Sequence, residues 1–345
     1  MANDFLGPSI DFDGASILIT GGTGSFGKAF IRYALERYRI RRLVVFSRDE
    51  QKQYEMQMRV PEEHRDLLRF FIGDVRDRDR LEIAMRGIDY VIHAAALKHV
   101  PAAEYNPFEC INTNVVGAEN VVHASIRTGV GKVIGLSTDK AANPINLYGA
   151  SKLAADKILV AANHLSGADG TRFAVVRYGN VVGSRGSVVP LFQRLIADGA
   201  ATLPITDPRM TRFWITLKQG VNFVISSLAL MEGGEIFVPK IPSMKMIDLA
   251  TAMAPDLEHE IIGIRPGEKL HEVMIPTDDA RATVELDDRY IITPSFVRWR
   301  SNGMWGDKAT KVDENFCYGS DTNDDWLTPE DLHRMVADSQ NAGLI

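Results

Sequence analysis

The chain has 345 residues, of which 45% are hydrophobic and 24% are charged, and its formal net charge is −6. This composition is ordinary for a globular protein with one large or two average domains. The mild acidity leaves no basic surface for nucleic acid or for an anionic membrane, so local arginines and lysines must hold any anionic ligand.

The two cysteines, Cys110 and Cys317, cannot build a disulfide framework and match no zinc-binding spacing. We expect free thiols in a reducing compartment and no metal site. The N-terminal residues lack the basic start and apolar stretch of a signal peptide, and no apolar run approaches the roughly 20 residues that span a bilayer. We therefore expect a cytoplasmic protein with no membrane partner.

The first regular elements form a strand, a glycine-rich turn and a helix. Residues 16–20 (SILIT) are an apolar run, GGTGSFG follows directly, and the next apolar residues recur at helical spacing. In G-x-x-G-x-x-G the glycines permit a tight turn, a close approach to a pyrophosphate, and close packing of helix on strand. A dinucleotide is expected here, on Gly21, Thr23, Gly24, Ser25, Phe26 and Gly27.

The second expected strand ends where dinucleotide-binding proteins carry an acidic residue for the ribose of NAD. Here Ser47 and Arg48 occupy that place, and Lys52 follows. A hydroxyl and two cations suit the 2′-phosphate of NADP. Asp49 and Glu50 argue the other way, although both are also suited to start a helix and face solvent.

The third and fourth expected strands, 70–75 and the run beginning DYVIH, also end in candidate ligands. Asp74 is placed to reach the adenine, although acidic residues just beyond it suggest a helix cap. Small residues after the fourth strand let the backbone lie against a cofactor, and Lys98 is a better substrate ligand than His99. The remaining expected cofactor contacts are Asp74, Val75, Ala94, Ala95, Ala96 and Val181.

Strand and helix alternate throughout residues 15–182, which predicts an α/β fold with a Rossmann-type, doubly wound parallel sheet. Residues 1–182 are the expected NADP-binding domain. Residues 183–295 are more irregular and richer in proline, and we expect a smaller C-terminal substrate-binding lobe with some segments returning to the sheet. Residues 296–345 are polar and suggest a partly extended arm.

The segment after the fifth expected strand gathers five side chains suited to proton transfer. In a helix, Tyr148 and Lys152 lie one turn apart on the same face. A neighbouring ammonium favours the phenolate, so we expect Lys152 to lower the pKa of Tyr148 and to bind the nicotinamide ribose. Thr138 is expected to share the substrate oxygen with Tyr148. Asp139 and Lys140 add an acid–base pair, so all five are candidate catalytic residues.

At this point the chain shows a family resemblance. TGGTGSFG, Y-x-x-x-K and RYGNVVG resemble extended short-chain dehydrogenase/reductases that act on nucleotide sugars. FSRDEQK, AAALKHVP, STDKAANPINLYGASK, MTRFWI, RPGEKLHE and YGSDTNDDWL resemble the inverting UDP-N-acetylglucosamine 4,6-dehydratases within them. The resemblance covers nearly the whole chain. It implies NADP as cofactor, UDP-N-acetylglucosamine as substrate, a homo-oligomer (dimer or hexamer), and the first step of pseudaminic acid synthesis, used in flagellin glycosylation.

The resemblance also implies the division of labour in the acid–base pair, with Asp139 as acid and Lys140 as base. We expect burial, Lys152 and the cofactor charge to lower the pKa of Lys140. Burial should keep Asp139 partly protonated and Lys140 should oppose this, so the two titrate as a coupled pair. The resemblance further implies that retaining relatives and certain epimerising relatives carry methionine where this chain has Tyr148, which favours inversion at carbon 5.

Two arginines, Arg212 and Arg265, resemble the diphosphate clamps of nucleotide-sugar relatives. Asn180 resembles a substrate-binding asparagine at the end of the sixth expected strand. Glu268 is a weaker candidate, because it would equally pair with Arg265. The full set of expected substrate residues is Lys98, Thr138, Asn180, Thr206, Arg209, Arg212, Arg265 and Glu268.

Three other functions fit parts of this pattern. A 4-epimerase or reductase of nucleotide sugars would share the cofactor turn and the Y-x-x-x-K spacing, whereas the resemblance implies that a retaining dehydratase would share the turn and carry methionine at the position of Tyr148. An inactive NADP-binding sensor would share only the turn. The Thr-Asp-Lys sequence argues against an epimerase or reductase, and Tyr148 with Lys152 argues against the sensor.

Overall fold

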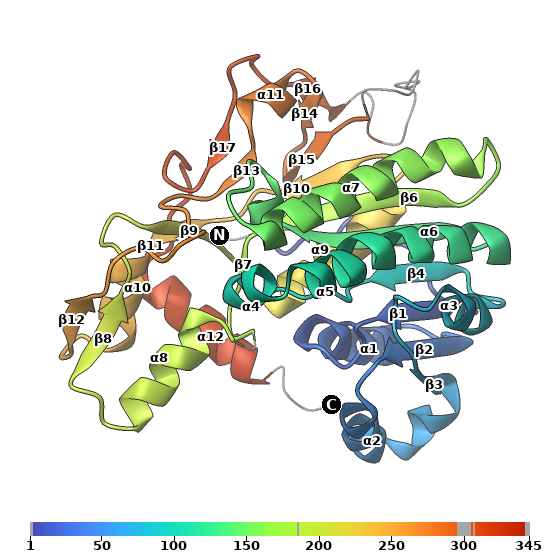
Figure 1. The fold of residues 1–345 in the computed structure, drawn as a ribbon, viewed down its shortest axis with the longest axis horizontal. Coiled ribbons are helices and arrows are strands. Elements are labelled where there is room, and N and C mark those ends of the chain that lie inside the picture. The colour runs from blue at the N-terminus through green and yellow to red at the C-terminus, as the bar shows by residue number, and fades with distance from the viewer. Residues whose placement is uncertain (1–2, 185, 295–304, 306–307, 342–345) are drawn as a thin grey trace.

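The computed structural model describes residues 3–184, 186–294, 305 and 308–341 (Figure 1). Its centre is one ten-stranded sheet. The strand order is β16 (Thr310–Lys311), β14 (Thr283–Glu285), β15 (Arg289–Ile292), β10 (Ile236–Pro239), β6 (Arg172–Tyr178), β5 (Lys132–Thr138), β4 (Tyr90–His93), β1 (Ser16–Thr20), β2 (Arg42–Ser47) and β3 (Leu68–Ile72). From β3 to β10 every pairing is parallel, whereas β15, β14 and β16 pair antiparallel at one edge.

Helices cover both faces of this sheet (Figure 1). One layer contains α3 (Arg78–Met85), α6 (Gly117–Thr128) and α7 (Leu147–Ser166), with α6 in contact with both of the others. On the opposite face α1 (Ser25–Arg37) contacts α9 (Leu217–Leu230), and α2 (Glu50–Arg59) packs on β2 and β3. The predicted Rossmann-type α/β fold is therefore confirmed.

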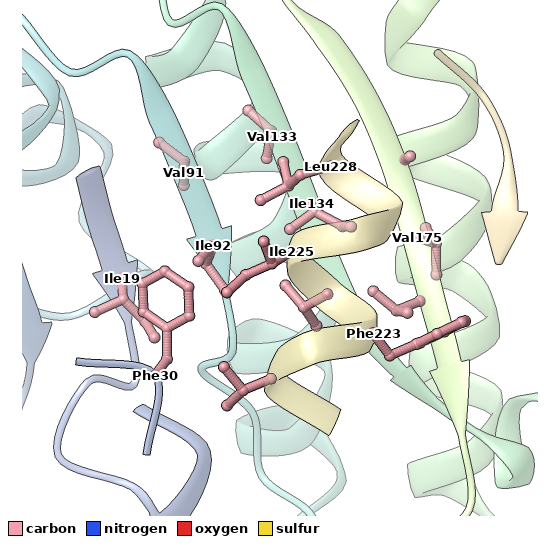
Figure 2. Close-up of a cluster of buried hydrophobic side chains, with 14 of the residues drawn as sticks. Ile19, Phe30, Val91, Ile92, Val133, Ile134, Val175, Phe223, Ile225 and Leu228 are labelled. Atoms are coloured by element: carbon pink, nitrogen blue, oxygen red, sulfur yellow. The ribbon is translucent and has the colours of Figure 1, made fainter. Parts of the chain in front are cut away.

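The main hydrophobic core lies between these layers. All five residues of β1 are buried, as expected for a parallel strand covered on both faces. Figure 2 shows α9 placing Phe223, Ile225 and Leu228 over the sheet, beside Ile92 and Ile134. The capping box of Thr216 and Gln219 fixes the start of α9, so its apolar face is held against β5 and β6.

A smaller lobe has its own core, in which Phe192, Trp214, Leu249 and Leu332 are buried. Its strands are β7 (Asn180–Val181), β8 (Thr202–Ile205), β9 (Thr211–Ile215), β11 (Ser243–Lys245) and β12 (Glu258–Ile261), and its helices are α8 (Val188–Ala197), α10 (Met246–Met253) and α12 (Pro329–Asn341). The tail thus contributes α12 to this core, where the sequence had suggested an extended arm.

Short elements complete the described chain. They are the 3-10 turns η1 (Glu62–Leu67) and η3 (Asp139–Ala141), helices α4 (Val100–Tyr105), α5 (Pro107–Ile111) and α11 (Thr277–Ala280), the π-helical turn η2 (Asn112–Val116), and the antiparallel pair β13 (Val273–Ile275) and β17 (Tyr318–Gly319). Within the described ranges, no helix is long and apolar enough to cross a bilayer.

Candidate active site

The glycine-rich turn joins β1 to α1 with almost no spare space. A Cβ on Gly21 would lie 2.9 Å from the backbone nitrogen of Ala95, and one on Gly27 would lie 2.4 Å from the carbonyl oxygen of Gly22. Gly24 caps α1 without any side-chain hydrogen bond to the first turn. The free N–H groups and positive dipole end of a 13-residue helix therefore remain available to an anion.

This turn borders a cavity of about 690 Å³. Every expected cofactor residue except Asp74 borders the same cavity. Thr113 borders it too, and its Oγ1 is buried without a hydrogen-bond partner among the described residues. A glycine cradle with an unpartnered hydroxyl nearby fits a dinucleotide. Thr113 was missed from sequence because only the π-helical turn η2 brings it to the cavity, and nothing in the sequence signals that turn.

At the far end of this cavity the expected phosphate ligands are held by carboxylates. Arg48 Nη1 lies 3.6 Å from Asp74 Oδ2, and Lys52 pairs with Asp49, the residue that caps α2. Asp74 also pairs with Arg76 at 2.7 Å. Burial acts to raise the pKa of Asp74, but hydrogen bonds from Arg76 outweigh it and hold that pKa below its ordinary value. Asp74 does not border the cavity itself, but it pairs with Arg48, which does.

The acid–base residues lie where β5 ends. Thr138 Oγ1 donates to Asp139 Oδ1 at 2.9 Å, and Lys140 Nζ donates to the same oxygen at 2.9 Å. Asp139 is fully buried, and its other oxygen, Oδ2, has no hydrogen-bond partner within the described part of the chain. A turn of 3-10 helix directly after the strand forces the two consecutive side chains together.

Tyr148 and Lys152 follow on the first turns of α7, which Asn146 caps by accepting from Gly149 N–H at 2.8 Å. Both side chains are buried, and Lys152 Nζ donates to the carbonyl oxygen of Leu136 at 2.7 Å. Burial lowers the pKa of Lys152.

The pKa of Tyr148 differs from the sequence-based expectation. Burial raises it to about 12, although Lys140 and a hydrogen bond with Thr138 act to lower it. Lys152, the group that was expected to lower it, donates to the carbonyl oxygen of Leu136. The group that favours the phenolate in this arrangement is therefore Lys140.

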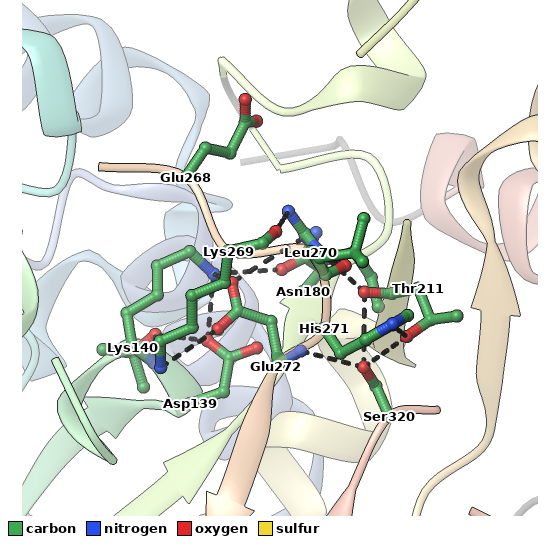
Figure 3. Close-up of polar contacts among 12 residues, drawn as sticks. Asp139, Lys140, Asn180, Thr211, Glu268, Lys269, Leu270, His271, Glu272 and Ser320 are labelled. Atoms are coloured by element: carbon green, nitrogen blue, oxygen red, sulfur yellow. Dashed lines mark hydrogen bonds and ion pairs between the residues drawn. The ribbon is translucent and has the colours of Figure 1, made fainter. Parts of the chain in front are cut away.

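Lys140 has a further partner that the sequence reading missed. Glu272 Oε1 lies 3.3 Å from Lys140 Nζ, and this carboxylate is only 2% exposed (Figure 3). Burial acts to lower the pKa of Lys140, but Asp139 and Glu272 outweigh it and raise that pKa. The prediction that the pKa of Lys140 is lowered was therefore wrong, and its two carboxylate neighbours favour the ammonium form. The available signal was the position of Glu272 at the end of RPGEKLHE.

A second cavity, of about 620 Å³, opens toward the smaller lobe. Lys98, Lys140 and Asn180 border both cavities, so the two meet at Lys140, whereas the buried Asp139 behind it borders neither. Burial lowers the pKa of Lys98. Of the expected substrate residues, the second cavity also gathers Thr206, Arg212, Arg265 and Glu268, whereas Thr138 borders only the cofactor cavity.

The arginines of this region differ in their surroundings. Arg212 is buried, and its guanidinium donates to the carbonyl oxygens of Thr211, Lys269 and Leu270. Arg265 is exposed and pairs with Glu268, the alternative partner considered from sequence. Arg209 does not border the cavity.

Arg209 instead pairs with Asp207 at 2.8 Å, and its side chain is 69% exposed. Both residues lie in the turn between β8 and β9. Arg209 therefore lies outside the lining of the second cavity, although Thr206 and Met210, on either side of it in the chain, border that cavity. No cluster of three metal-binding side chains occurs among the residues that the structure describes.

Comparison with known proteins decides the family. Residues 17–294 match the family described as polysaccharide biosynthesis protein. The chain belongs to this family. One relative of the chain is an inverting UDP-N-acetylglucosamine 4,6-dehydratase of Campylobacter jejuni subsp. jejuni serotype O:23/36 (strain 81-176). The two are 57% identical over 330 residues, which cover 94% of this chain and 98% of the relative. The predicted resemblance to inverting dehydratases is thereby confirmed.

Two further proteins are similar to this chain over most of its length. A UDP-glucose 4-epimerase of Rickettsia canadensis (strain McKiel) is 43% identical over 80% of this chain and 82% of its own. The X-ray structure of Pen from Bacillus thuringiensis superimposes with a TM-score of 0.86 and 37% identity, covering 97% of this chain and all of that one.

Proposed function

We propose that this chain is an NADP-dependent UDP-N-acetylglucosamine 4,6-dehydratase that inverts carbon 5. The observation that carries the proposal is the 2.9 Å hydrogen bond to Asp139 from Lys140, which lies at the meeting point of a dinucleotide-type cavity and a second cavity. Removal of water across two carbons needs a base for the proton on one carbon and an acid for the hydroxyl on the other. The 57% identical relative bears this activity in its name.

The cavity at the glycine turn holds NADP. The helix α1 terminus and the Gly21, Gly24 and Gly27 backbone receive the pyrophosphate, and Ser47, Arg48 and Lys52 receive the 2′-phosphate. Asp74 holds Arg48 in place. Bound there, NADP⁺ would supply the acceptor for the hydride of carbon 4 and the donor of that hydride to carbon 6.

The second cavity holds the UDP-sugar. Arg265 and Glu268 border this cavity, and the Arg265 side chain, which is 62% exposed, would receive the diphosphate. The Arg212 guanidinium donates to backbone carbonyl oxygens, so it holds the 269–272 segment in place and adds positive charge to the cavity. Lys98, Asn180 and Thr206 bind the sugar beside the acid–base pair.

In the oxidation step the base is the phenolate of Tyr148, the minority form of a group whose pKa burial raises to about 12, and it accepts the proton of the 4-hydroxyl. Thr138 shares the substrate oxygen, and Lys140 favours the phenolate. Lys152, anchored on Leu136, orients the nicotinamide ribose. The result is a 4-keto sugar, whose carbonyl acidifies the proton on carbon 5.

In the elimination step Lys140 must first lose a proton. Asp139 Oδ1 is 2.9 Å away, so the proton crosses one hydrogen bond and produces a neutral amine and a protonated carboxyl together. A bound sugar excludes water, and low polarity favours such a neutral pair over a buried ion pair. Lys140 then takes the proton from carbon 5, Asp139 protonates the 6-hydroxyl, and water leaves as the carbon 5–carbon 6 double bond forms.

After hydride returns to carbon 6, protonation of carbon 5 on the opposite face gives UDP-2-acetamido-2,6-dideoxy-L-arabino-hexos-4-ulose. This product is the starting compound of pseudaminic acid synthesis.

The two cysteines in the structure are unpaired, which agrees with a reducing, cytoplasmic setting.

NMR of the reaction with UDP-N-acetylglucosamine in D₂O tests the proposal. We expect a 4-keto-6-deoxy sugar carrying deuterium at carbon 5 with inverted configuration. A 4-epimer with no loss of water would instead establish the epimerase alternative, which the 43% identical relative's name supports. Deuterium at carbon 5 with unchanged configuration would make the enzyme a retaining dehydratase.

A further inference from the structure

Glu272 is a buried carboxylate to which the reaction scheme gives no role. It lies directly before β13 in the chain, 132 positions after Lys140, yet its side chain borders the second cavity beside the acid–base pair. A carboxylate that is 2% exposed needs compensating charge. Three cations surround it, from three different segments.

The three cations lie at different distances from the carboxylate oxygens of Glu272. Lys140 Nζ lies 3.3 Å from Oε1, Lys269 Nζ 3.6 Å from Oε2, and Arg212 Nε 3.8 Å from Oε1 (Figure 3). Arg212 already donates to three backbone carbonyls, and Lys269 donates to the carbonyl oxygen of Ala142 at 2.6 Å. Lys140 is therefore the nearest cation and the one without a backbone anchor.

An ammonium has three N–H donors. Lys140 Nζ faces three acceptors, namely Asp139 Oδ1 at 2.9 Å, Asn180 Oδ1 at 3.5 Å and Glu272 Oε1 at 3.3 Å. Asp139 is its neighbour in sequence and Asn180 lies after β6, so only Glu272 reaches it from the segment joining the smaller lobe to β13. These three acceptors define where the amine can lie.

We propose that Glu272 is the positioning residue that holds Lys140 beside Asp139 at the meeting point of the two cavities. Its part in catalysis rests on the proposed dehydratase function. Without Glu272 the amine would keep one close acceptor and one distant amide, and its charge would lose one of two counter-charges. Glu272 also ties Lys140 to Lys269 and Arg212, so the acid–base pair moves with the segment that carries Arg265 and Glu268.

The groups facing Lys140 determine what removal of Glu272 does. Asp139 and Glu272 favour the ammonium, and Arg212, Lys269 and burial oppose it. Tyr148 also interacts with Lys140, and at neutral pH it is an uncharged phenol. Replacing Glu272 by the isosteric glutamine therefore leaves one carboxylate against two cations, and the neutral amine becomes more populated.

Acetylation of the full-length protein by acetic anhydride at pH 9 measures this directly, because only the neutral amine reacts. Peptide mass spectrometry gives the rate for each lysine. We expect Lys140 to react about tenfold faster or more in Glu272→Gln, since a counter-charge at this distance shifts a pKa by about one unit or more. Glu272→Asp, which keeps the charge but withdraws it, should give a smaller increase.

The matched control is Glu260→Gln, which removes an exposed carboxylate from β12 and should leave the rate at Lys140 unchanged. Lys132, half-buried and bonded to Leu228 O, reports any general loosening and should react equally in all variants. An unchanged rate at Lys140 in Glu272→Gln, or a parallel rise at Lys132, overturns the proposal. If Glu272→Gln does not fold, Glu272→Asp decides in the same way.

This assay needs no sugar, so its outcome is independent of the proposed reaction. A wild-type protein that makes no 4-keto sugar would refute the dehydratase function while the acetylation rates still test the placement of Lys140. Conversely, an active wild type with unchanged acetylation in Glu272→Gln would refute only the role of Glu272.

Discussion

Replacing Lys140 by methionine tests the arrangement of charges in the site through protein stability. The substitution keeps most of the side-chain volume and removes the cation that lies 2.9 Å from Asp139 and 3.3 Å from Glu272. Both carboxylates are buried, with exposures of 0% and 2%. Lys269 and Arg212 remain near Glu272, so Asp139 loses its only close cation among the described residues.

The expected loss follows from burial. Removing one partner of a buried ion pair costs about 3–5 kcal/mol. The Lys140 side chain is 25% exposed, so we take a lower value, about 2–3 kcal/mol. An unfolding entropy of about 2.1 cal/mol/K per residue gives about 0.7 kcal/mol/K for the chain, and hence a fall in Tm of about 3–4 °C.

The Tm difference between Lys140→Met and wild type should also depend on pH, in a direction that the charges determine. Without Lys140, two neighbouring carboxylates raise the pKa of one of them above its unfolded value. A carboxyl of this kind destabilises the protein above its unfolded pKa, and the penalty disappears as the pH falls through the raised value. The difference in Tm between variant and wild type should therefore be complete at pH 8 and smaller at pH 5.

Differential scanning calorimetry at pH 8 and pH 5 measures both quantities, with Lys218→Met as a control for loss of an exposed lysine on α9. A Lys140→Met variant that melts within about 1 °C of wild type at pH 8 would refute the reasoning. So would a Tm difference that grows toward pH 5, because that sign requires an uncompensated cation.

Three further changes test other parts of the site. Gly27→Ala places a Cβ 2.4 Å from the carbonyl oxygen of Gly22, so NADPH binding measured by fluorescence titration should be lost while the far-ultraviolet circular dichroism spectrum stays. Arg48→Ala should weaken NADP binding by about tenfold and change NAD binding little, because one charge-assisted contact contributes about 1.5 kcal/mol; equal losses for both would remove Arg48 from the 2′-phosphate site. Tyr148→Phe should lower the rate of hydride transfer by about 10²–10⁴-fold. Burial raises the pKa of Tyr148 to about 12, so the ultraviolet titrations of the cofactor-free variant and wild type should match below pH 10. A tyrosinate signal below pH 10 that wild type shows and the variant lacks would contradict this.

The fold was predictable because its signals are local. The apolar run of β1, the glycines after it and the helical spacing in α1 lie within about 20 consecutive residues, and each constrains the next. The same local logic predicted many of the residues that border the cavity at the glycine-rich turn, but it wrongly included Asp74 and missed Thr113. The placement of α12 in the second core was not predictable, since Leu332 meets Leu249 and Phe192 only through contacts distant in sequence.

The electrostatics of the site were predicted less well, and for a related reason. Neighbours in sequence gave the contact between Asp139 and Lys140 correctly, but the sign of the pKa shift of Lys140 depends on Glu272, which is remote in sequence. For Tyr148, helical spacing placed Lys152 on the same face, yet its ammonium binds the Leu136 carbonyl. Spacing predicts which side chains are neighbours, and it does not predict which acceptor each donor chooses.

This difference changes what must happen before elimination. A lysine whose pKa was already depressed would remove the carbon 5 proton on arrival of the sugar. Asp139 and Glu272 instead raise the pKa of Lys140, so in the proposed mechanism a proton has to reach Asp139 first, across their shared 2.9 Å hydrogen bond. In that mechanism the same transfer creates the acid that protonates the 6-hydroxyl. One proton movement therefore prepares both groups together, which prevents the base from acting before the leaving hydroxyl has its acid.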